Sequence, residues 1–204
     1  MNDPRAGGHI YIWTLGANKT AHVVAREFGH DNVLGILLDR TPPEMRLALA
    51  LELGEESLFD ELLASRPDLV RTLTHADRRK LVDAAQASNA RAVRLMLAAG
   101  WPVDARGQHD GTALHWAAWH GNAEMVREIL RYRPPIEDRG NEFNSPPIGW
   151  AVHGSVNSWR RTTGDYAATV EALLEAGAEA PKFTGDLEAS EPVRAVLRER
   201  AGGG

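Results

Sequence analysis

The sequence predicts an all-α protein in which short helical hairpins repeat along the chain and stack into a solenoid. One observation is a recurring turn position, whose intervals are 25, 34, 33 and 33 residues and whose occupants are Gly29, Gly54, Ser88, Gly121 and Gly154. The other is a pair of large apolar residues after each of the first four turns: Leu37–Leu38, Leu62–Leu63, Met96–Leu97 and Ile129–Leu130. Because one hairpin cannot cover its own apolar stripe, the hairpins are expected to pack side by side.

The residues around the turns support helical hairpins. Glycine tolerates the positive φ that a tight turn between two helices requires. A small residue stands four positions before the first four turns, where it lets neighbouring helices approach closely: Ala25, Ala50, Ala84 and Ala117. The alternative is a bundle of unrelated helices, but a bundle gives no reason for a 33-residue period.

Composition excludes several classes of protein. The chain has 204 residues, a formal net charge of −5 and no cysteine. The lack of cysteine excludes disulfides, thiolate metal ligands and cysteine nucleophiles. The negative charge disfavours nucleic acid, since phosphate binding needs a positive field, and no apolar run approaches the roughly 20 residues that span a bilayer. We therefore expect a cytoplasmic protein that binds neither nucleic acid nor a membrane.

The fourth hairpin carries a family resemblance. Its sequence, GTALHWAAWHGNAEMVREIL (111–130), resembles the ankyrin signature of a TPLH-type start, an Ala-Ala pair, a turn glycine and a second helix with Val-x-x-Leu-Leu spacing. The preceding segment, AAGWPVDARGQHDGT (98–112), resembles the β-finger that joins ankyrin repeats. With GWAVHGS (149–155) following, the chain is similar to a bacterial group of ankyrin-repeat proteins. The resemblance covers residues 20–180 and implies an ankyrin-repeat solenoid of about five repeats with short β-finger loops.

The period and the resemblance together give the expected boundaries. The repeats are placed at 20–40, 45–66, 79–106, 112–139 and 145–180. Residues 1–19 are expected to form an extended segment or the remnant of a preceding repeat. Residues 181–204 are expected to form a capping helix, which starts at Ser190, and a disordered tail.

Two connections depart from the repeat pattern. Residues 39–44 are too short for a finger, so a tight Pro-Pro turn is expected there. Residues 65–78 lack the turn chemistry of a finger, so a short helical or extended detour is expected, with Thr74 or Asp77 starting the third repeat.

The fifth repeat fits the frame only with an insertion of 11 residues after Gly154. The insertion lies within 155–166 and is expected to form a protruding loop that carries Trp159, Arg160 and Arg161. Because loops carry function and Trp and Arg dominate interaction hot spots, this loop is a candidate contact site. The alternative is a tolerated insertion whose Trp159 folds back onto the repeat.

The sequence offers no convincing catalytic or metal site. His109, His115 and His120 lie near Asp110 and Glu124, but zinc needs three or four ligands that converge on one point. The ankyrin resemblance instead gives His115 the TPLH position, which implies local hydrogen bonding to backbone. The sequence contains neither a phosphate-binding glycine loop nor a GxSxG nucleophile motif. We therefore expect no catalytic residues, metal or cofactor.

A recognition surface remains as the expected function. The resemblance implies a concave surface built from finger tips and from the residues just before each turn. The expected partner-binding residues are Arg106, Gln108, His109, Trp116, Trp119, His120, Phe143, His153, Trp159, Arg160 and Arg161.

This surface predicts a monomeric, non-enzymatic module that binds a protein partner. Two alternatives are a regulatory or docking segment of a larger protein or enzyme assembly and, more remotely, a metal-dependent hydrolase. For Trp116 and Trp150 the competing interpretation is packing between repeats.

Overall fold

The structure is a computed structural model that describes residues 20–181 and 187–202. Within these ranges the chain forms helices and no strand. It divides into two compact units, Met1–Leu73 and Thr74–Gly204. The expected N-terminal segment, 1–19, lies outside the described residues, as do Gly203 and Gly204 of the expected tail.

The first unit contains two helical hairpins and a short 3₁₀ helix. The elements are α2 (Ala21–Glu27), α3 (Asp31–Asp39), α4 (Pro43–Glu52), α5 (Glu56–Ser65) and η1 (Leu69–Thr72). Gly29 and Gly54 turn the two hairpins with φ of 68° and 73°. An ion pair between Arg26 and Glu55 connects one hairpin to the other. The core of the unit consists of apolar side chains from α4, α5 and η1, including Leu47, Leu49, Phe59 and Leu69.

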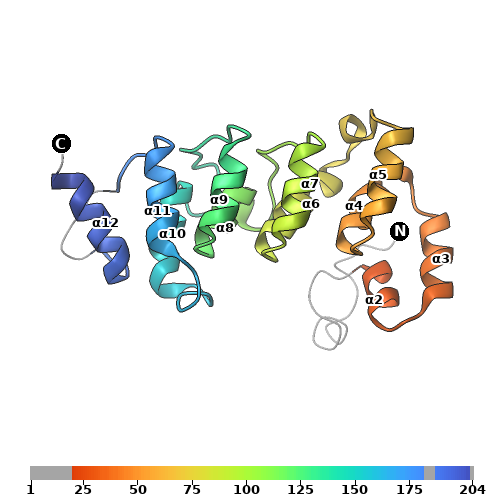
Figure 1. The fold of residues 1–204 in the computed structure, drawn as a ribbon, viewed down its shortest axis with the longest axis horizontal. Coiled ribbons are helices and arrows are strands. Elements are labelled where there is room, and N and C mark those ends of the chain that lie inside the picture. The colour runs from red at the N-terminus through yellow and green to blue at the C-terminus, as the bar shows by residue number, and fades with distance from the viewer. Residues whose placement is uncertain (1–19, 182–186, 203–204) are drawn as a thin grey trace. The chain divides into compact units, whose positions relative to one another are not determined.

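The second unit is a row of three hairpins closed by one helix (Figure 1). Its elements are α6 (His75–Gln86), α7 (Ala90–Ala98), η2 (Gln108–Asp110), α8 (Ala113–Trp119), α9 (Ala123–Leu130), α10 (Pro147–Asn157), α11 (Tyr166–Glu175) and α12 (Glu191–Gly202). The first helices α6, α8 and α10 pack in one layer and the second helices α7, α9 and α11 in the other. Helix α12 covers α11. The predicted all-α stack of hairpins is therefore confirmed within this unit.

A side-chain cap from Asn or Asp starts each second helix of this unit. Asn89 accepts a hydrogen bond from the N–H of Ala92, and Asn122 accepts one from Met125, each at 3.0 Å. Asp165 caps α11 in the same way. These side chains satisfy backbone donors that a helix start leaves free, so each second helix begins at a defined position after its turn or loop.

The segments between the helices agree in part with the expectations from the sequence. Helix α4 begins at Pro43 directly after the short connection from α3. Thr74, one of two residues expected to start the third repeat, caps α6 in a capping box with Asp77. The repeat thus starts several residues earlier than 79. At the C-terminus, Ala201 and Gly202 continue α12, so the helix reaches further into the expected tail than the sequence indicated.

Gly154 does not turn the fifth hairpin. It lies inside α10, which continues to Asn157, so the protruding part of the insertion is limited to residues 158–165. A Cβ at Gly154 would lie 2.6 Å from the carbonyl oxygen of Trp119. Glycine is therefore required here for the close approach of α10 to α8, and the turn interpretation was wrong.

Candidate functional site

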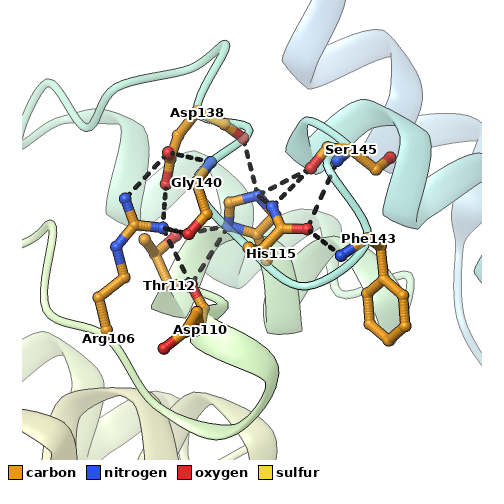
Figure 2. A network of polar contacts seen from close by, with 9 residues as sticks. Arg106, Asp110, Thr112, His115, Asp138, Gly140, Phe143 and Ser145 are labelled. Atoms are coloured by element: carbon orange, nitrogen blue, oxygen red, sulfur yellow. Dashed lines mark hydrogen bonds and ion pairs between the residues drawn. The ribbon is translucent and has the colours of Figure 1, made fainter.

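His115 fixes the start of α8 and the finger that follows it (Figure 2). Its Nδ1 lies 3.2 Å from the backbone N of Thr112 and 2.9 Å from the Thr112 hydroxyl. Because a backbone N–H can only donate, Nδ1 carries the lone pair and Nε2 carries the proton. Nε2 then donates to the carbonyl of Asp138 at 3.0 Å. Burial lowers the pKa of His115, which favours this neutral form.

Arg106 ties two successive fingers together. Its Nη1 donates to the carbonyls of Asp110 and Gly140 at 2.9 and 3.0 Å. Its Nη2 donates to Oδ1 of Asp138 at 3.0 Å, and Nη1 lies 2.8 Å from Oδ2. Burial alone would raise the pKa of Asp138, but Arg106 and the N–H of Gly140 outweigh it and lower the pKa. The guanidinium of Arg106 is therefore already engaged within the protein.

Asn141 shapes the next finger tip. Its Oδ1 accepts from the N–H of Phe143 at 3.2 Å, and its Nδ2 donates to the carbonyl of Ser145 at 2.8 Å. Figure 2 shows the Phe143 ring pointing away from this network. The ring is 58% exposed. The polar network thus holds a large apolar side chain out in solvent.

His109 joins the two finger tips. It has a left-handed backbone, with φ of 58°. Its carbonyl accepts from the N–H of Glu142 at 3.1 Å, and its Nδ1 lies 2.7 Å from Oε2 of Glu142. The His109 and Phe143 rings are 5.3 Å apart. Beside it, Oε1 of Gln108 accepts from the side chain of Gln86 at 2.8 Å.

Tryptophans from α8, α10 and the insertion pack edge to face behind these finger tips. The ring centroids are 5.5 Å apart for Trp116 and Trp150, and 6.1 Å apart for Trp119 and Trp159. Trp150 also contacts Phe143, at 5.5 Å. Such tilted and T-shaped pairs are the favoured geometry of aromatic rings.

The cluster has a buried and an exposed part. We call Trp116, His120 and Trp150 the aromatic floor, since their exposed fractions are 4%, 1% and 5%. We call the residues above it the aromatic surface: His109, Trp119, Phe143, His153 and Trp159. Trp159 is 63% exposed. The five residues of the aromatic surface were all predicted partner-binding residues. The structure joins them, through the ring of Trp116 in the floor, into one set of ring contacts.

Trp116 and His120 require a correction, because both were predicted on the exposed face and both are buried. Nε2 of His120 donates to the carbonyl of Gln86 at 2.9 Å, which ties α8 to α6. Burial and the charge of Arg160 lower the pKa of His120. Both side chains can support a contact surface but do not form it. For Trp116 and Trp150, packing between repeats was the correct interpretation.

The insertion both folds back and projects. The ring of Trp159 lies 5.1 Å from the ring of His120, although most of the indole is exposed. Sequence reasoning missed the anchor of this loop, Tyr166, whose hydroxyl donates to the carbonyl of Trp119 at 3.0 Å. No local signal in the sequence indicates this contact, because it joins two residues that are 47 positions apart in the chain.

A cavity of about 390 Å³ lies between the α8–α9 turn and the insertion loop. Its charged lining residues are Glu124, Arg127, Arg160 and Asp165. The cavity lining therefore contains two guanidinium groups and two carboxylates. The described residues include no group of three or more His, Asp or Glu arranged to hold a metal ion. In the same part of the chain no helix has the length and apolar character needed to cross a membrane.

Comparison with known proteins agrees with the helical repeats. Residues 45–139 match the family model of ankyrin repeats, in its form with three copies. This stretch begins within α4 and ends after α9. Residues 45–139 therefore contain ankyrin repeats, as the sequence resemblance implied.

Two curated proteins resemble this chain over 99 residues, which is 48% of its length. One is the palmitoyltransferase Hip14 of Drosophila melanogaster, with 28% identity. The other is the E3 ubiquitin-protein ligase XB3 of Oryza sativa subsp. japonica, with 34% identity. The matched segment spans only 14% of the former and 22% of the latter.

Proposed function

We propose that this chain is a non-catalytic protein-binding module that contacts its partner with the aromatic surface. The observation that carries the proposal is the exposure of Phe143 and Trp159, at 58% and 63%, above a floor of buried aromatic rings. Large apolar side chains that gather in solvent next to polar groups are typical of interaction sites.

The surface is also rigid before any partner arrives. Phe143 is positioned by the Asn141 turn, and the two fingers are joined by Arg106 and Asp138. Trp159 rests against the ring of His120. A preorganised surface loses little conformational entropy on binding, so more of the contact energy is retained as affinity.

A capture experiment tests the proposal. Proteins retained by the immobilised wild-type chain should be lost with Phe143→Ala and with Trp159→Ala, because each change removes an exposed anchor. Phe28→Ala is the matched control, since Phe28 is 59% exposed but belongs to the first unit. Quantitative mass spectrometry gives the readout. Retention that is equal for the wild type, Phe143→Ala and Trp159→Ala would refute the proposed surface.

A second candidate is a docking segment that serves an enzyme. It is supported by the two relatives, which are named as enzymes and of which the matched segment forms a small part. In this case the protein bound by the aromatic surface is itself a catalytic protein, or the substrate of one. Reconstitution of a captured partner with wild type and with Trp159→Ala distinguishes the two, because only a docking segment changes the partner's catalytic rate.

A further inference from the structure

The charges around the aromatic surface are distributed unevenly. Helices α8 and α10, which carry Trp119 and His153 of this surface, contain no Asp, Glu, Lys or Arg. Residues 158–164 of the insertion contain two arginines and no carboxylate. The whole chain has a net charge of −5, so this loop is a local basic segment in an acidic protein.

The two arginines flank the most exposed ring of the cluster. Arg160 and Arg161 directly follow Trp159, and neither forms an ion pair with any described residue. Arg161 is exposed and Arg160 is half-buried. Arg106, by contrast, is held by Asp138. The insertion thus presents two guanidinium groups that have no carboxylate partner in the described structure.

The nearby carboxylates that the structure describes form no ion pair with these two arginines. Asp165 accepts from the N–H of Ala168 as the cap of α11. Glu124 lines the same cavity as Arg160, together with Arg127. At the end of the aromatic surface formed by the finger tips, Glu142 is paired with His109. The aromatic surface therefore has an apolar centre, a basic end at the insertion and a finger end that carries Glu142.

We propose that the partner segment is acidic and apolar, with an aromatic or aliphatic side chain against Trp159 and carboxylates against Arg160 and Arg161. This inference rests on the proposed function. Guanidinium groups form two-point hydrogen bonds with carboxylates, and Trp and Arg together make the strongest interface anchors. Charge complementarity at one end also fixes the direction in which the segment lies.

Selection from phage-displayed random peptides on the full wild-type chain tests the chemistry without a known partner. The enriched peptides should place Asp or Glu next to an aromatic or aliphatic residue. A synthetic enriched peptide should then lose at least about tenfold in affinity for Arg160→Glu/Arg161→Glu. The affinity for wild type should also fall as salt is added, because exposed charges are screened. Fluorescence anisotropy measures both effects.

Two matched variants separate local recognition from net charge. Arg40→Glu/Arg71→Glu changes the net charge equally, at exposed positions of the first unit, and should leave the affinity within about twofold. Exchange of the peptide's carboxylates for lysines should restore binding to Arg160→Glu/Arg161→Glu. Thermal melting checks that each variant is folded. Trp159→Phe should retain more affinity for the peptide than Trp159→Ala, because it keeps an aromatic ring at this position.

The two proposals fail in different ways. Enriched peptides that depend on Trp159 and Phe143, but lack acidic residues or ignore Arg160→Glu/Arg161→Glu, would overturn the acidic-segment inference alone. Peptides whose binding is unchanged by Trp159→Ala and Phe143→Ala would overturn the aromatic surface as the contact site. A selection that enriches nothing over the Trp159→Ala chain counts against both.

Discussion

The hydroxyl of Tyr166 donates to the backbone carbonyl of Trp119 at 3.0 Å, which ties the end of the insertion to the preceding repeat. The backbone N–H of Asp165 reinforces this link by donating to the carbonyl of Gly121 at 2.8 Å. A Cβ at Gly121 would lie 2.9 Å from the Tyr166 ring, so the two segments are in close contact. The exposed Trp159 is therefore carried by a loop that is anchored at its base.

Tyr166→Phe should lower the free energy of unfolding by about 1 kcal/mol, because it removes one hydrogen bond and retains the ring. Chemical denaturation measures the loss. Tyr132→Phe is the control, since the Tyr132 side chain is 36% exposed and its hydroxyl makes no hydrogen bond with the described residues. Equal stability of Tyr166→Phe and wild type would show that the hydroxyl does not anchor the loop.

Gly154→Ala should destabilise the protein by about 1–3 kcal/mol, because the new methyl group would collide with the Trp119 carbonyl. Gly35→Ala is the control, since Gly35 also lies inside a helix, α3, but a Cβ there would meet no described atom within 4 Å. That variant should gain about 0.5–1 kcal/mol, as alanine favours helix over glycine. Thermal denaturation of both variants gives the comparison, and a stabilising Gly154→Ala would contradict the close approach of α8 and α10.

Arg106 and Asp138 should show a coupling of about 1 kcal/mol in a double-mutant cycle of alanine variants, since their ion pair is partly shielded from water. The side chains are 33% and 10% exposed. Arg131 and Glu128 form a comparison pair in which the arginine is 74% exposed. Its coupling should stay below about 0.5 kcal/mol because of solvent screening. A larger coupling for the exposed pair would argue against Arg106 as a finger-to-finger link.

The free energy of unfolding should fall as the pH drops below about 6.5, in part because of His115 and His120. In both residues burial lowers the folded-state pKa from the 6.5 of an unperturbed histidine. The unfolded chain then binds more protons than the folded chain in this range. The stabilisation is complete above 6.5 and is lost towards the folded-state values.

Nuclear magnetic resonance of the imidazole nitrogens checks the same assignment directly. Both rings should be neutral with the proton on Nε2, because Nδ1 of His115 accepts from Thr112 and Nε2 of His120 donates to Gln86. A titration midpoint of His115 at or above 6.5 would contradict its lowered pKa.

Local signals in the sequence were sufficient to predict the helical hairpins. The period, the turn glycines and the apolar pairs predicted stacked helices, and Thr74 carried a recognisable capping signal. Burial along the apolar stripe was less predictable. Ile129 is fully buried, but its neighbour Leu130 is only half-buried, because the exposure of each depends on where the adjacent repeat lies.

The candidate site was only partly predictable for the same reason. The repeat frame identified Trp119, Phe143 and His153 as neighbours, but it could not show that Trp116 is covered by the next repeat. Gly154 was wrongly assigned to a turn, because a glycine that permits close helix packing cannot be distinguished in the sequence from a turn glycine. Contacts between repeats depend on side chains far apart in the chain, and a periodic pattern does not encode them.

The tryptophan cluster gives this protein a built-in optical reporter. The indole Nε1 atoms of Trp116, Trp119 and Trp150 are buried without a hydrogen-bond partner among the described residues, whereas Trp159 faces water. Their emission should therefore lie at shorter wavelength than that of Trp159. Rings this close also couple their electronic transitions, so near-ultraviolet circular dichroism should register any molecule that covers Trp159, with no dye attached.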